Sequence, residues 1–120
     1  MSEELQVFND PYNFQARVPF DHGVNLVKLV RAGDPPPGEI MILAGAIVGE
    51  IGALRRSGFS FTQSDAESAA VEAMTIDGAM ESIEQVIMVK DATDPTFDPT
   101  PYLPILLKIA LWFLERWANK

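Results

Sequence analysis

The sequence predicts an all-α fold, a small bundle of three or four helices with an extended N-terminal arm. The main observation is a run of apolar residues with the 3, 4 spacing of a helical heptad. This run comprises Ala66, Ala69, Ala73, Ile76, Met80, Ile83 and Ile87. A second observation is a set of helix start and stop signals: Ser64 and Glu67 match a capping box, while Gly33 and Gly58 suit positions just after a helix end. We therefore expect one long helix over residues 64–90, with shorter helices packed beside it.

The amino-acid composition limits the classes of protein to which this chain can belong. The 120 residues suit a single domain, and 48 % apolar residues are enough for a core, which argues against disorder. Nine basic residues stand against 17 acidic ones, and a net charge of −8 argues against binding nucleic acid, whose phosphates are also negative. The absence of cysteine excludes disulfides, thiolate metal sites and cysteine nucleophiles, and it suits a reducing compartment.

The apolar segments predict a soluble, cytoplasmic protein. The first residues, MSEEL, have neither the basic nor the apolar segment of a secretory signal. The two most apolar runs cover residues 40–49 and 103–114, and the second contains Lys108. Both are shorter than the roughly 20 residues that a membrane span needs.

The first third of the chain gives weaker signals. Residues 1–20 are expected to form the extended arm, because Pro11 and Pro19 limit regular structure. A short helix is expected over residues 22–32, with Asp21 as its cap, although the valines there favour a strand as the alternative. The three prolines that follow predict a rigid turn, with a proline-rich ligand as the alternative.

Two further helices are predicted over residues 39–56 and 101–118, and both are apolar nearly all round. In the first, Gly45, Gly49 and Gly52 form a smooth strip, although each glycine costs a helix about 1 kcal/mol relative to alanine. Such a strip predicts that another backbone comes very close. The sequence leaves open whether that backbone belongs to the same chain or to a second copy.

The other predicted helices offer too little apolar surface to cover the helices over residues 39–56 and 101–118 on all sides. The sequence therefore predicts a protein–protein interaction module. A homo-oligomer is expected, with a dimer favoured, or else a subunit or adaptor of a larger assembly. Aromatic side chains commonly anchor such contacts. The predicted interface residues are Gly45, Gly49, Leu111, Trp112, Phe113 and Trp117.

Catalytic chemistry has little support in the sequence, and no catalytic residue or cofactor is assigned. The single histidine, His22, is expected to be a capping or surface residue rather than a general base. Asp77, Glu81 and Glu84 share one helix face and are candidate Mg²⁺ or Mn²⁺ ligands, which makes a metal-dependent hydrolase one alternative. The sequence favours a solvated acidic face instead, because a metal site needs ligands from a second helix.

A peripheral membrane binder is the other alternative. The last helix combines aromatic and basic residues, as interfacial helices do. These residues are Lys108, Trp112, Phe113, Arg116, Trp117 and Lys120. Anionic lipid would repel the acidic remainder of the chain, so membrane binding is not the preferred interpretation.

Overall fold

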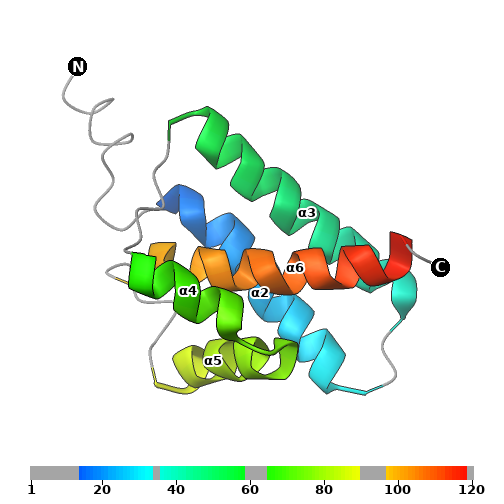
Figure 1. Cartoon of the computed structure of the whole chain (residues 1–120). Coiled ribbons are helices and arrows are strands. Elements are labelled where there is room, and N and C mark those ends of the chain that lie inside the picture. Colours follow the sequence, from blue (N-terminus) through cyan, green and yellow to red (C-terminus); the bar gives the residue numbers. More distant parts are fainter. Residues whose placement is uncertain (1–13, 34–35, 59–64, 90–96, 119–120) are drawn as a thin grey trace.

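A computed structural model of the chain describes residues 14–33, 36–58, 65–89 and 97–118 (Figure 1). All regular structure in these ranges is helical. The elements are α2 (Phe14–Arg31), α3 (Pro37–Arg56), α4 (Asp65–Ala73), α5 (Ile76–Val89), the 3₁₀ turn η1 (Thr100–Tyr102) and α6 (Leu103–Ala118). The predicted all-α class is confirmed. The described ranges contain five α-helices, rather than the three or four that we expected.

The helices pack around the contact between α2 and α6 (Figure 1). Helix α3 packs against both of them from one side, and α5 packs against both from the other. Short α4 lies over α6. The largest fully buried side chains come from all four of the longer helices, so a single apolar core holds them together. They include Phe20, Leu26, Ile47, Ile51, Ile83, Leu103, Leu106 and Ile109.

The predicted extended arm over residues 1–20 is wrong for its described part. Helix α2 begins at Phe14 and contains Pro19 in its interior, so neither the cap at Asp21 nor the strand alternative is correct. Residues 1–13 lie outside the described ranges. Proline removes one helical hydrogen bond, but Ala16 and Phe20 on either side are almost completely buried. Their burial in the core outweighs the local penalty of the proline.

An aromatic cluster fixes the segment before α6 against α2. The Phe97 ring lies 5.2 Å from the Phe20 ring and stacks on Tyr102 at 6.0 Å, measured between ring centroids. Arg17 donates a hydrogen bond of 2.8 Å to the backbone carbonyl of Phe97, and its guanidinium lies over the Phe97 ring. Contacts between aromatic rings in these tilted and stacked arrangements add to the energy of burial.

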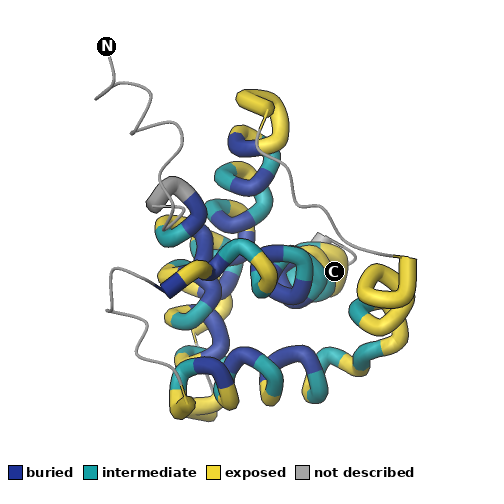
Figure 2. The backbone as a smooth tube through the Cα atoms, turned by 90° about the vertical axis from the view of Figure 1, so that its left-hand side faces the viewer, coloured by how far each residue is buried: buried dark blue, intermediate teal, exposed yellow. Residues whose placement is uncertain are grey.

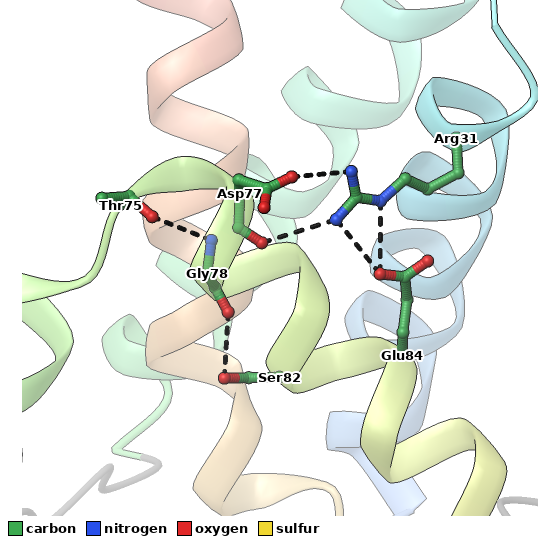
Figure 3. Close-up of polar contacts among 6 residues, drawn as sticks. All are labelled: Arg31, Thr75, Asp77, Gly78, Ser82 and Glu84. Atoms are coloured by element: carbon green, nitrogen blue, oxygen red, sulfur yellow. Dashed lines mark hydrogen bonds and ion pairs between the residues drawn. The ribbon is translucent and has the colours of Figure 1, made fainter.

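The single long helix expected over residues 64–90 is interrupted at Met74 and Thr75. Thr75 caps α5: its hydroxyl oxygen accepts a hydrogen bond of 2.9 Å from the backbone N–H of Gly78 (Figure 3). The heptad pattern is buried in α5, at Met80 and Ile83, whereas no residue of α4 is buried. The three seam alanines of α4 bury too little surface to extend the packing. Ser64, the predicted capping-box residue, lies outside the described ranges.

Both predicted helix-end glycines are confirmed. Gly33 has φ +82° and Gly58 has φ +93°, and they follow α2 and α3 respectively. This left-handed conformation is accessible to glycine without a steric penalty, so each residue lets the chain leave its helix.

Helix α3 is longer than its apolar run suggested. It has 20 residues and contains an 18-residue window with a mean hydropathy of 1.5, so by length and composition it is the one helix of the described ranges that could cross a membrane. Only 28 % of that window is buried. Five of its residues lie in the core, and core helices of soluble proteins can have the same length and composition. The finding is therefore weak evidence for a span.

Candidate functional site

The candidate site is an open groove of about 630 Å³ between α4 and α6. Six apolar residues make up most of its surface, and the polar residues include both charge signs. The lining residues are Arg55, Ser68, Val71, Glu72, Ile76, Pro104, Leu107, Lys108, Leu111, Trp112 and Glu115. Its volume falls within the range of roughly 300–1,000 Å³ that is typical of ligand pockets. The open shape suits a side chain or short segment of another protein better than an enclosed small molecule.

One wall of this groove is held weakly. Figure 2 shows α4 exposed along its length, to the side of α6. Val71 of α4 packs against the core, and Lys108 of α6 donates a hydrogen bond of 2.9 Å to the backbone carbonyl of Glu72. Because a hydrogen bond contributes only about 1 kcal/mol, these contacts place α4 without fixing it firmly.

The floor of the groove carries two of the predicted interface residues. Leu111 is 40 % exposed and Trp112 is half-buried. The guanidinium of Arg116 lies 4.3 Å from the centroid of the Trp112 ring, a cation–π contact that holds the indole in place. An aliphatic and an aromatic side chain that are both accessible resemble the anchor residues of protein interfaces.

The remaining predicted interface residues lie elsewhere. Phe113 packs against the core, and the side chain of Trp117 is outside the described part of the structure. Gly45 and Gly49 are exposed on the outer face of α3, where an added Cβ would meet no atom of the described residues within 4 Å. The prediction of close packing within the chain at these glycines is therefore wrong, and the alternative, contact with a second copy, stays a prediction.

The glycine that admits a neighbour within the chain is Gly23, which the sequence analysis did not single out. A Cβ added there would lie 2.7 Å from Cδ1 and 2.9 Å from Cγ of Leu106. Gly23 thus allows α2 and α6 to cross closely. No local pattern marks this residue, because its role depends on which helix crosses at that point.

The candidate metal face contains an ion-pair network instead (Figure 3). Arg31 of α2 binds Asp77 Oδ1 at 2.7 Å and Glu84 Oε1 at 3.2 Å, which ties α2 to α5. The hydrogen bond to Asp77 is the main reason that the pKa of Arg31 is raised. Glu81 is exposed. The described residues contain no group of three or more side chains that could hold a metal ion.

His22 lies within α2 rather than at a helix start, so the capping role is wrong. Its Nδ1 is 2.8 Å from Glu50 Oε1, and both side chains are about one-third exposed. The pair connects α2 to α3 at the edge of the core.

Metal removal provides a direct test of the acidic face. We expect EDTA, or added Mg²⁺ or Mn²⁺, to leave the melting temperature unchanged, because Arg31 already pairs with Asp77 and Glu84. A metal bound only to the folded state would add about 2.7 kcal/mol at 100 times its dissociation constant. Arg31→Ala should lower the melting temperature slightly, and high salt should reduce that difference. An EDTA-sensitive melting temperature in the wild type would contradict this assignment.

The charge state of Arg31 adds an expectation about pH. A raised pKa means that folding favours the charged guanidinium, and that, as the pH rises, this contribution to stability is lost only when the pH passes through the folded value. Both values lie far above neutral pH, so deprotonation of Arg31 should not affect stability near neutrality.

Comparisons with protein-family models, with curated proteins and with solved structures each found no match for this chain. The functional argument therefore depends on the groove, on the exposed helix faces and on the charges around them.

Proposed function

We propose that this protein is a small helical protein–protein interaction module that self-associates, with a dimer as the simplest case, or serves as a subunit or adaptor of a larger assembly. The observation that supports this most is the accessible apolar floor of the α4–α6 groove, with Leu111 and Trp112. The acidic, cysteine-free composition suits work in the cytoplasm.

The charges around the groove indicate what kind of partner it suits. Arg55 and Lys108 contribute two positive charges, and Glu72 and Glu115 contribute two negative ones. A strongly charged ligand would meet repulsion as well as attraction. An apolar protein segment with a polar border matches this arrangement better, as in the core and rim of known interfaces.

The two alternatives have less support. A hydrolase that uses the acidic face would have to displace Arg31 from Asp77 and Glu84. For a membrane-binding α6, the aromatic and basic residues would have to share one free face. Phe113 packs on the core and Lys108 binds the backbone of α4, so these two residues are already engaged.

The test is the mass of the protein in solution, measured by sedimentation equilibrium over a range of concentrations. We expect the wild type to self-associate, and we expect Leu111→Glu and Trp112→Glu to weaken association at least tenfold, because burying an unpaired carboxylate is costly. Gln85→Glu, which adds the same charge at an exposed position of α5, is the matched control. Circular dichroism would verify that each variant is folded.

A wild type that stays monomeric would refute self-association. Variants that keep the wild-type mass would show instead that the groove takes no part in the contact.

A further inference from the structure

The outer face of α3 is unpartnered in the described structure and lies opposite the side that enters the core. Its residues follow the spacing 4, 3, 4, 3, 4 along the helix. They are Gly38, Ile42, Gly45, Gly49, Gly52 and Arg56. Ile42 is 71 % exposed, the largest of the apolar side chains on this face. Because only 28 % of the apolar window of α3 is buried, the helix carries more apolar surface than the core uses. The burial of individual residues shows the same division, because the five buried residues of α3 alternate along the sequence with the residues of this face.

This face is complementary to itself when two copies run antiparallel. A two-fold axis at the level of Ile47 would place Gly45 opposite Gly49 of the second copy, and Ile42 opposite Gly52. Ile42, the one large apolar side chain of the face, then meets Gly52 beside the Arg56 guanidinium, and the two central glycines allow the backbones to approach closely. Helix pairs with small residues at the contact reach the short end of the usual interaxial range of about 8–10 Å.

The charges at the two ends of α3 favour the same orientation. Glu39 lies in the first turn and Arg56 in the last turn, and both are exposed. In an antiparallel pair, each Arg56 lies next to Glu39 of the second copy. A parallel pair would bring like charges together at both ends, and it would also align the helix dipoles unfavourably. The charge pattern therefore favours a second copy of this chain as the occupant of the face.

We propose that two copies of the protein pair through the outer faces of their α3 helices, antiparallel and around a two-fold axis. The inference rests on the self-association put forward under Proposed function and adds to it a contact surface separate from the α4–α6 groove. None of the residues of this face lines the α4–α6 groove. The two surfaces can therefore be tested separately.

The first experiment blocks the close approach. Gly49→Leu places two leucines at the centre of the pair, whereas within the described part of a single copy the new Cβ meets no atom within 4 Å. Sedimentation equilibrium should show the dissociation constant rising at least tenfold. The melting temperature of the monomer should not fall, since leucine is a better helix former than glycine. The matched control, Gln85→Leu on the exposed side of α5, should leave the dissociation constant unchanged.

The second experiment tests the orientation by exchanging charges. Glu39→Arg and Arg56→Glu should each weaken their own homodimer, because each places like charges at both ends of the pair. Mixing the two variants should restore association, since the heterodimer has an attractive pair at each end. The weakening of each single variant is what identifies the antiparallel arrangement. In a parallel pair the wild type already has like charges at both ends, so neither substitution would add repulsion, although the mixture would associate in either arrangement. Glu81→Arg, an equal change of charge at an exposed position of α5, is the control and should have no such effect.

Each outcome decides between the proposals. A monomeric wild type overturns both this inference and the proposed self-association. A wild-type dimer that tolerates Gly49→Leu, or that shows no rescue in the mixture, overturns only the pairing through α3. A monomer that co-sediments with neutral phosphatidylcholine vesicles, and loses that binding in Ile42→Asp, shows that lipid covers the face instead.

Discussion

Replacing Gly23 by valine is expected to destabilise the fold by about 3 kcal/mol, the upper end of the usual cost of overpacking a core. A Cβ at this position would overlap Leu106, which is 1 % exposed and has little room to move. Urea unfolding followed by circular dichroism measures the effect. The loss should appear as a lower midpoint with an unchanged slope.

A double mutant separates this clash from any other effect of the substitution. Gly23→Ala combined with Leu106→Ala should cost less than the sum of the two single changes, because the alanine at position 106 leaves space for the new Cβ. If Gly23→Val unfolds at the same urea concentration as the wild type, the close crossing of α2 and α6 is not what this glycine provides.

The second large effect is expected at Phe97. Replacing it by alanine should cost about 3–5 kcal/mol, because a large ring is removed from a buried site and a cavity remains. Phe97 is 8 % exposed and packs against both Phe20 and Tyr102, so the segment before α6 would lose its main contacts with α2. Thermal unfolding should shift to lower temperature, and the near-ultraviolet circular dichroism of the aromatic side chains should weaken.

Two control variants test whether the loss of stability comes from the buried volume of the Phe97 ring. Phe97→Leu keeps much of the apolar volume and should cost less than alanine. Val89→Ala removes an apolar side chain that is 76 % exposed and should change stability by no more than about 0.5 kcal/mol. Equal stability of Phe97→Ala and the wild type would show that the aromatic cluster does not anchor α6.

Helices α3 and α6 were predicted well because the signals that place them lie within their own sequences. The apolar stretch ending at Arg56 and the one beginning near Leu103 were placed within a few residues, because their composition and end signals act locally. Helix α2 was predicted too short because Pro19 is unfavourable in isolation. The packing of Ala16 and Phe20 in the core overrides this penalty, and a local pattern cannot reveal that packing.

The interruption between α4 and α5 did have a signal in the sequence. Thr75 followed by Asp77 fits the start of a helix, yet the heptad pattern continues across it and suggested one unbroken element. Because the sequence suggested one unbroken helix over α4 and α5, the groove could not be predicted from it. It exists only because α4 leaves the direction of α5 and lies over α6, which brings Val71 and Leu111 to the same cavity.

The short length of α4 has a consequence for how the groove can change shape. Nine residues are too few to form a stable helix alone in water, and none of those in α4 is buried. Its helical state therefore depends on its contacts with α6. If α4 moved away from α6, the groove would widen and those contacts would be lost. The opening of the groove and the unfolding of α4 would then occur together. A partner that fills the groove would recover the cost of ordering this segment, which couples recognition to the folding of a single helix.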